Sequence, residues 1–157
     1  MKLSFWSIGK SHDPLLKAAI EEFTSRVNRY YPVKWQIIPP VKNSGSLSGS
    51  DLKKKEAGAV LSLLTKDDFL VALDEYGKEW SSKQLSEFIQ VRANESTRQI
   101  VFLIGGAYGL DESVLQSAQF RWSLSALTFP HHLVRLILAE QVYRACTIGR
   151  NEGYHHE

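Results

Sequence analysis

The stretch Gln99-Ile-Val-Phe-Leu-Ile-Gly-Gly-Ala-Tyr-Gly109 decides the fold class of this chain. Its first part, Gln99 to Ile104, is an apolar run of strand length, which is typical of a strand buried on both faces of a parallel sheet. The glycines that follow predict a tight turn in which the backbone can approach a ligand closely, although a plain turn explains them equally well. Their spacing is not the Gly-x-Gly-x-x-Gly of dinucleotide-binding proteins, and the chain has no Gly-Lys-Ser/Thr phosphate loop. Nicotinamide and nucleoside-triphosphate chemistry are therefore disfavoured.

Strands and helices are expected to alternate on either side of this stretch. Strand patterns occur over residues 2–8, 33–38, 69–73 and 121–124. Helices are expected to begin near Asp13-Pro14, at Ser50-Asp51 after a flexible loop, at the capping box of Ser81 and Gln84, at Asp111, and after Pro130. This alternation predicts an α/β fold, with a mainly parallel sheet flanked by helices, in a single domain over residues 1–157.

Three strand ends carry the turn residues that a ligand site needs. They are Leu73 to Gly77, Gly105 to Gly109, and Leu124 to Pro130. In open α/β sheets, ligands bind beyond the carboxyl ends of the strands. The segment Leu124-Ser-Ala-Leu-Thr-Phe-Pro-His131 is apolar with small hydroxyls, so it can cradle a flat ring while its backbone amides and carbonyls contact the ring edge. The alternative is a buried strand followed by the start of a helix.

The last helix, from about His131 to Ile148, is apolar around most of its circumference. Its apolar residues are Leu133, Val134, Leu136, Ile137, Leu138, Ala139 and Val142. A helix of this kind is buried on more than one side. One side can meet the sheet, and a second copy of the chain supplies the other partner most simply. The sequence therefore favours a homodimer, and a helix central to the monomer is the alternative.

Composition indicates a globular protein of a reducing compartment. Hydrophobic residues make up 43% of the chain, and its single cysteine, Cys146, has no partner for an internal disulfide. The apolar patch at the N-terminus is too short for a signal peptide, and no run approaches the roughly 20 residues of a membrane span. We therefore expect a cytoplasmic protein that contacts no membrane.

The net charge and the positions of the histidines exclude few further classes of function. The net charge of +2 permits a polyanionic partner without requiring one. The basic run Lys53 to Lys55 is either a solvated face or a contact to RNA. The five histidines have no cysteine or carboxylate at metal-ligand spacing, so no metal is expected.

Several ordered motifs together resemble the RlmH family. They are Ile104-Gly-Gly-Ala-Tyr-Gly-Leu110, Trp122-Ser-Leu-Ser-Ala-Leu-Thr-Phe-Pro-His131, Arg135, Glu140-Gln-Val-Tyr-Arg144, and Tyr154-His155. The similarity also covers Met1 to Gly9 and Leu73-Asp74, so it runs nearly from end to end. Members of this family are ribosomal large-subunit RNA pseudouridine N3-methyltransferases of the SPOUT superfamily.

The resemblance implies a C-terminal trefoil knot, through which two subunits pair. It places S-adenosylmethionine in the knot, in contact with Leu73, Gly105 and the residues of 124–129, which are Leu124, Ser125, Ala126, Leu127, Thr128 and Phe129. The implied substrate is a pseudouridine of large-subunit ribosomal RNA, reached on assembled ribosomes. His156 stands where family members commonly carry Arg or Lys.

The chemistry assigns candidate roles to the tail. The N3 imide of pseudouridine must lose its proton before or during attack on the methyl group, and a base near it helps. His155 is the candidate base, and Tyr154 is the candidate for stacking on or orienting the nucleobase. The alternative is that both residues only dock the tail. Two rival functions are a related enzyme acting on transfer RNA and a non-catalytic ribosome-binding protein that kept the knot.

Overall fold

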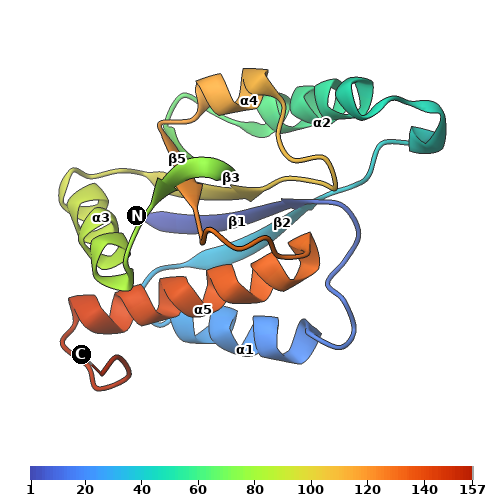
Figure 1. The fold of residues 1–157 in the computed structure, drawn as a ribbon. Helices are drawn as coiled ribbons and strands as arrows, with labels where there is room; N and C mark the ends of the chain where they lie inside the picture. The colour runs from blue at the N-terminus through green and yellow to red at the C-terminus, as the bar shows by residue number, and fades with distance from the viewer. Residues whose placement is uncertain (157) are drawn as a thin grey trace.

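A computed structural model describes residues 1–156 of the chain. It contains a five-stranded sheet in the order β2-β1-β4-β3-β5, and every recorded strand pair is parallel (Figure 1). The strands are β1 (Lys2–Ile8), β2 (Val33–Ile38), β3 (Asp68–Glu79), β4 (Gln99–Ile104) and β5 (Phe120–Ser123). The helices are α1 (Lys17–Val27), α2 (Gly49–Leu63), α3 (Ser82–Asn94), α4 (Glu112–Ser117) and α5 (His131–Gly149). The predicted α/β class and parallel sheet are confirmed.

Alternating side chains of the central strands divide the interior into two cores. Phe5 and Phe102 point to the face covered by α1, α3 and α5, where they pack with residues such as Leu138. Trp6 and Leu103 point to the opposite face, covered by α2 and α4 (Figure 1). Because β1 and β4 are buried on both faces, they have no polar face along most of their length, as the apolar run of β4 indicated.

Helix starts follow the expected capping chemistry, with two differences. The capping box of Ser81 and Gln84 and the cap at Asp111 are present. The cap of α2 is Ser48, whose hydroxyl accepts from the Asp51 amide at 3.1 Å, so the cap lies two residues before the predicted one at Ser50-Asp51. A short 3₁₀ helix, η1 (Ser44–Ser46), precedes it.

The start of α1 also differs from the prediction. The Asp13 side chain accepts from the amide of Leu15 at 2.8 Å, and its carbonyl accepts from Leu16 and Lys17. Asp13 therefore stabilises a turn that precedes the helix, and α1 itself begins at Lys17.

β3 is longer than the apolar run of residues 69–73 suggested. It continues to Glu79 after a register shift against β5 between Leu73 and Lys78. A Cβ at Gly77 would lie 2.7 Å from the Arg121 carbonyl carbon, so only glycine permits the strand to resume its pairing. The prediction missed this half because its side chains are mostly polar and exposed. β5 lies one residue earlier than expected.

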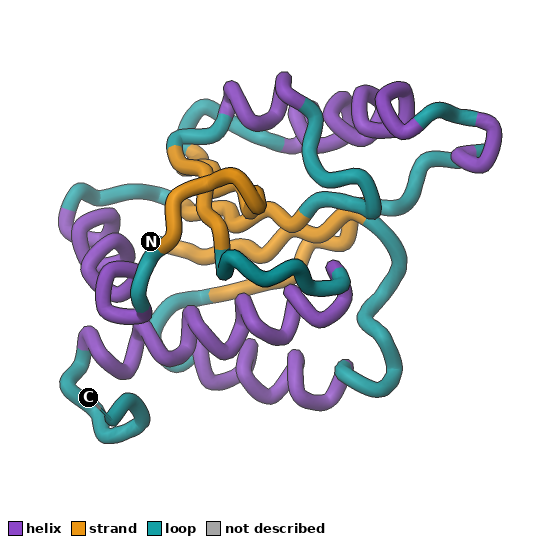
Figure 2. The backbone as a smooth tube through the Cα atoms, in the orientation of Figure 1, coloured by secondary structure: helices purple, strands orange, loops and turns teal. Residues whose placement is uncertain are grey.

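After β5 the chain crosses back over the sheet. Residues 124–130 run from the edge strand toward β1, where α5 begins (Figure 2). This crossing is compatible with the trefoil knot, which stays a prediction. α5 then packs between α1 and α3 along the face of the sheet (Figure 1).

Cys146 lies inside this packing on α5. Its side chain is buried, and burial raises the pKa of the thiol to about 12. The expectation of a buried free thiol is confirmed. No helix within residues 1–156 has the length and apolarity to cross a membrane.

A substitution at Leu138 tests the packing of α5 against the core. Its side chain is fully buried within one chain, so Leu138→Ala removes apolar contacts and leaves a cavity. We expect the free energy of unfolding to fall by about 2–5 kcal/mol, as measured by denaturant titration. Leu15→Ala is the matched control, since Leu15 is 92% exposed, and it should change stability little. Equal effects of the two substitutions would contradict the packing of α5.

Candidate functional site

The carboxyl ends of β4 and β5 and the register shift of β3 at Leu73 bring together the residues expected to form one site. β3 lies between β4 and β5, with Ala72 paired to Leu103 and Leu73 paired to Trp122. This register places Leu73 next to the end of β4, where Gly105 follows, and next to the end of β5, where Leu124 follows. Leu73 and Leu124 are both half-buried against the core that contains Ile104. Sequence segments far apart in the chain therefore meet at this edge.

Gly105 is required by the turn itself. A Cβ at this position would lie 2.9 Å from the Gly109 carbonyl carbon and 3.1 Å from Leu110 Cδ2. The turn closes through the Gly109 amide, which donates to the Gly106 carbonyl at 3.1 Å. The space at Gly105 is thus filled by the returning chain, as the plain-turn alternative has it, and contact of its backbone with a ligand stays a prediction. Gly109 has φ +80°, a conformation that favours glycine.

Residues 124–129 present an open backbone beside this turn. The Ser125 hydroxyl accepts from the Leu127 amide at 3.0 Å, and the Ser125 carbonyl accepts from Ser123 Oγ at 3.0 Å. Within residues 1–156, the amides of Ala126 and Thr128 have no hydrogen-bond acceptor. The Leu127 side chain is 70% exposed. The segment therefore offers unused backbone amides and apolar surface, the features expected of a cradle for a flat ring.

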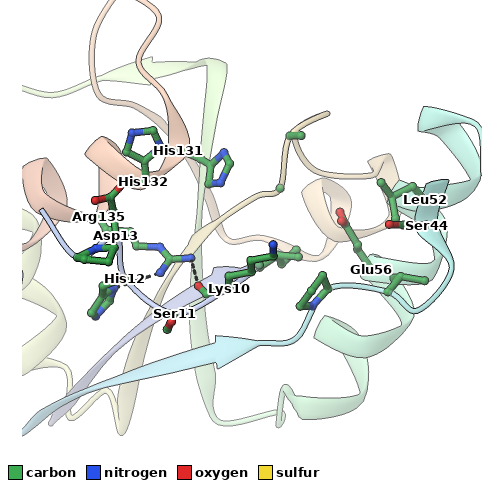
Figure 3. Close-up of a pocket in the computed structure, with 17 residues that line it drawn as sticks. Lys10, Ser11, His12, Asp13, Ser44, Leu52, Glu56, His131, His132 and Arg135 are labelled. Atoms are coloured by element: carbon green, nitrogen blue, oxygen red, sulfur yellow. Dashed lines mark hydrogen bonds between the residues drawn. The ribbon is translucent and has the colours of Figure 1, made fainter. Parts of the chain in front are cut away.

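A pocket of about 540 Å³ lies beside this edge, at the ends of β1, β2 and β4. It is lined by Ile8, Gly9, Lys10, Ser11, His12, Asp13, Pro14, Pro40, Val41, Ser44, Leu52, Glu56, Gly106, Ala107, His131, His132 and Arg135 (Figure 3). Its size falls in the range of small-molecule and nucleotide sites. Its walls come from the loop after β1, the chain from β2 to α2, and the start of α5.

Arg135 anchors one end of the pocket. Its side chain is 2% exposed, and its guanidinium donates to Ser7 Oγ and to the Lys10 carbonyl, each at 2.9 Å (Figure 3). Nη1 lies 3.1 Å from His12 Nδ1. Within residues 1–156, no carboxylate forms an ion pair with Arg135. Its positive charge is therefore held by neutral groups, and burial lowers the pKa of the guanidinium.

Histidines surround this cation. Burial, followed by the charge of Arg135, lowers the pKa of both His12 and His131. His131 and His132 are exposed on the first turn of α5 and both line the pocket. Within residues 1–156, no group of three or more His, Cys, Asp and Glu is arranged to hold a metal.

The tail residues form a network on the other end of α5. The Tyr154 hydroxyl donates to Glu140 Oε1 at 3.1 Å, and Arg144 donates to the same oxygen. The Arg144 guanidinium lies 4.8 Å from the Tyr154 ring centroid. Burial, and then the charge of Glu140, raises the pKa of Tyr154. The tail is thus packed against the molecule, in keeping with the alternative that Tyr154 and His155 dock it.

His155 lies against the same arginine. Arg144 Nη1 is 3.3 Å from His155 Nδ1, and when Nδ1 accepts, the proton of the neutral ring is on Nε2. In this arrangement the ring has no free acceptor nitrogen. His155 can accept a proton through Nδ1 only after its contact with Arg144 is broken.

Tyr154 and His155 are not brought to the strand-end site of their own chain. α5 has 19 residues, so its two ends lie about 28 Å apart. Arg135 near its start contacts the end of β1, whereas the tail follows its last turn, on the side where β1 begins (Figure 1). The two groups of predicted site residues therefore occupy opposite ends of one helix.

Sequence reasoning missed part of the pocket. Lys10 and His12 follow β1 directly, so their place at a strand end was a usable signal. Glu56 lies in the middle of α2 among residues with no distinguishing pattern, and nothing local pointed to it. The loops around it, rather than its own helix, create its surroundings.

The family of the chain follows from comparison with known proteins. The sequence pattern of the family described as predicted SPOUT methyltransferase matches residues 1–155. The chain belongs to the SPOUT methyltransferase family. Enzymes of this family take their methyl group from S-adenosylmethionine.

Relatives of this SPOUT methyltransferase match it over its whole length. A protein named ribosomal RNA large subunit methyltransferase H from Parabacteroides distasonis is 41% identical, and one of the same name from Flavobacterium johnsoniae is 43% identical, each with 100% of both chains covered. The solved structure of a probable methylase family protein from Haemophilus influenzae Rd KW20 is similar in fold, with a TM-score of 0.55 at 10% identity. That similarity covers 99% of this chain and 70% of the other.

Gly105→Ala tests the turn at the end of β4. The added methyl group meets the Gly109 backbone, so the turn must shift and the unfolding free energy should fall by about 1–3 kcal/mol. Affinity for S-adenosylmethionine, measured by calorimetry on the folded variant, should fall as well. Gly45→Ala is the control, because a Cβ there meets nothing within 4 Å. Unchanged stability and affinity in Gly105→Ala would contradict the tight turn.

Proposed function

We propose that this SPOUT methyltransferase methylates N3 of a pseudouridine in large-subunit ribosomal RNA. The observation that carries the proposal is full-length similarity, at about 40% identity, to proteins named ribosomal RNA large subunit methyltransferase H. The choice of pseudouridine N3 rests on the motifs at the ends of β4 and β5 and in the tail. We further propose that the enzyme is cytoplasmic, homodimeric and active on assembled ribosomes.

S-adenosylmethionine is proposed to bind where β4 and β5 end, beside the register shift of β3 at Leu73. The residues present fit it: Leu73 and Leu124 supply apolar walls, and the amides of Ala126 and Thr128 have no acceptor within the described chain. Together with Gly105, Ser125, Leu127 and Phe129, they make the complete set that we assign to the cofactor. When bound, the cofactor supplies an electrophilic methyl group on a sulfonium.

The chain's part in the reaction is mainly orientation. The open edge must hold the acceptor nitrogen, the methyl carbon and the sulfur in line, and such positioning supplies a large part of the barrier reduction. The imide proton must also leave N3. We assign His155 to take it through Nδ1, and Tyr154 to hold the nucleobase by its ring face.

Those roles require a second subunit. The tail follows the last turn of α5, about 28 Å along the helix from its start, where residues 124–130 arrive from β5, so we assign its action to the site of a partner. The outer side of α5 is suited to pairing: Leu133, Leu136 and Ile137 are only half-buried in the monomer. A dimer that covers this side buries their apolar surface and can bring each tail to the other subunit.

Ile137→Glu tests the dimer. A glutamate buried without a partner costs several kcal/mol, so the dimer dissociation constant should rise on the order of a hundredfold or more. Sedimentation velocity over a concentration series measures it. Leu138 does not serve this purpose, because its side chain is buried within the monomer. Val91→Glu, on α3 and 45% exposed, is the control and should leave the oligomeric state unchanged. A dimeric Ile137→Glu with wild-type affinity would remove α5 from the interface.

His155→Ala and Tyr154→Phe test the tail. We expect His155→Ala to lower the methylation rate on the order of a hundredfold, because it removes the proposed proton acceptor. Tyr154→Phe keeps the ring and loses only the hydrogen bond to Glu140, so it should be milder. Deletion of residues 154–157 should abolish activity and leave cofactor binding intact; Glu157 lies outside the described residues.

A mixing experiment decides whether the tail acts in the partner. Subunits without residues 154–157 are combined with subunits carrying Gly105→Ala, after dissociation and reassociation. Hybrid dimers contain one intact composite site, so activity should return. Activity no higher than that of the separate variants would contradict action across the dimer.

The proposed substrate is tested by methyl transfer to purified ribosomes, with the modified nucleoside identified by mass spectrometry. N3-methylpseudouridine in large-subunit RNA is the expected product. Transfer to transfer RNA instead would favour the related function, and binding to ribosomes without methyl transfer would favour a non-catalytic protein.

A further inference from the structure

The pocket of about 540 Å³ remains available once the cofactor residues are assigned. None of Leu73, Gly105 and residues 124–129 lines it, although Gly106 and Ala107 in its wall directly follow Gly105. The pocket therefore lies next to the cofactor edge and is separate from the residues assigned to the cofactor. A second reactant placed in it would lie beside the methyl donor.

Glu56 is the unusual residue of this pocket. Its side chain is only 8% exposed, and within residues 1–156 its carboxylate has no hydrogen-bond donor and no ion-pair partner. Oε1 and Oε2 lie 2.9 Å and 3.2 Å from the place where a Cβ on Gly106 would be, so the carboxylate lies against the turn after β4. The carboxylate oxygens face the pocket and are not fully enclosed, but the residue is mostly buried, and its charged form is costly without a donor. Groups of this kind are enriched at functional sites.

The other end of the pocket is cationic. Arg135 carries a charge that no carboxylate within residues 1–156 balances, and Lys10 and His132 stand beside it with exposed side chains (Figure 3). A ligand that matches both ends has N–H donors at one end and an anion at the other. A nucleotide whose base carries free N–H groups has this polarity.

We propose that this pocket receives the target pseudouridine nucleotide, whose N1–H donates to the Glu56 carboxylate while its phosphate lies near Lys10 and His132. The proposal rests on the proposed function, since it concerns the substrate of the same reaction. Glu56 then determines the specificity of the enzyme for pseudouridine over uridine.

We assign N1–H, rather than N3–H, as the donor to Glu56 for a reason that comes from comparing pseudouridine with uridine. N3 accepts the methyl group in the plane of the ring, so a carboxylate fixed at that position would block the methyl donor. N1–H is the other N–H of pseudouridine, and uridine presents a C–H at the same place. With uridine the buried carboxylate is left without a donor, and sites built to bind an N–H reject analogues that lack it by as much as 10⁴–10⁵-fold.

The stability of the free protein gives an independent readout. Burial raises the pKa of Glu56, so the folded protein retains its proton at pH values where the unfolded chain has lost it. Folding is therefore weakened as pH rises through this range. Glu56→Met removes the penalty, and its melting temperature relative to wild type should increase from pH 4 to pH 7. Lys10, His12, Asp13, His131, His132 and Arg135 also line the pocket, and all of them are unchanged in this comparison.

Binding of free nucleotides tests the specificity directly. Pseudouridine 5′-monophosphate and uridine 5′-monophosphate are titrated into the wild-type protein in the presence of S-adenosylhomocysteine and followed by NMR. Wild type should prefer pseudouridine 5′-monophosphate by at least about tenfold, and Glu56→Met should bind both equally. Glu56→Gln keeps an acceptor oxygen and should retain part of the preference.

Two controls separate base contact from phosphate contact and from general effects. His132→Ala should weaken both nucleotides by the same factor, because it removes a hydrogen-bonding side chain near the phosphate and leaves Glu56 in place. Glu87→Met changes an exposed glutamate of α3 and should alter nothing. Equal binding of the two nucleotides by wild type, or a preserved preference in Glu56→Met, overturns the proposal. A loss of cofactor affinity in Glu56→Met as large as the loss of nucleotide affinity overturns it too, because Glu56 then serves the cofactor.

This experiment is independent of the test on ribosomes. A wild-type protein that fails to methylate ribosomes refutes the proposed function, whereas the nucleotide preference and its loss in Glu56→Met still decide the role of the pocket. If ribosomes are methylated and the preference is absent, only the role of Glu56 is refuted.

Discussion

The hydrogen bonds of Arg135 to Ser7 and Lys10 fix the path of the last third of the chain. They tie the start of α5 to the end of β1, although the preceding strand, β5, lies at the far edge of the sheet. Residues 124–130 must therefore cross the ends of the intervening strands to connect the two. The same crossing creates the open backbone of residues 124–129 and leads into His131 and His132, which line the pocket. A buried charge held by neutral groups is costly to form, and removing its partners leaves it uncompensated, so the arrangement tolerates little change.

The fold was largely predictable because its central strands carry a strong signal. β1 and β4 are buried on both faces; β4 carries an uninterrupted apolar run, and in β1 only the buried Ser4 and Ser7 interrupt it. The second half of β3 was not predictable, since its exposed residues depend on pairing with β5 and on the absence of a side chain at Gly77. The helix cap at Ser48 differs from the expected one because several adjacent residues, Ser48, Ser50 and Asp51, can all cap, and only tertiary packing chooses among them.

The meeting of Leu73, Gly105 and Leu124 was predictable from the strand order, whereas the surroundings of Glu56 and of the tail were not. Leu73, Gly105 and Leu124 are far apart in sequence, and parallel pairing brings them to one edge, as the topology required. Glu56 belongs to a helix whose own pattern is ordinary, and only the loops packed over it make its carboxylate unusual. The packing of Tyr154 against Glu140 and Arg144 was equally hidden, because it depends on how the tail turns after α5.

The single cysteine has a practical consequence for spectroscopy. Cys146 is enclosed by α5 and its neighbours, and its thiol stays protonated at the pH of ordinary labelling reactions. The surface of the native protein is therefore free of reactive thiols over the described residues. A cysteine introduced near the tail and another near the strand ends would accept fluorophores or spin labels selectively without prior removal of Cys146. The distance between the two labels then becomes measurable on a chain that is otherwise unaltered.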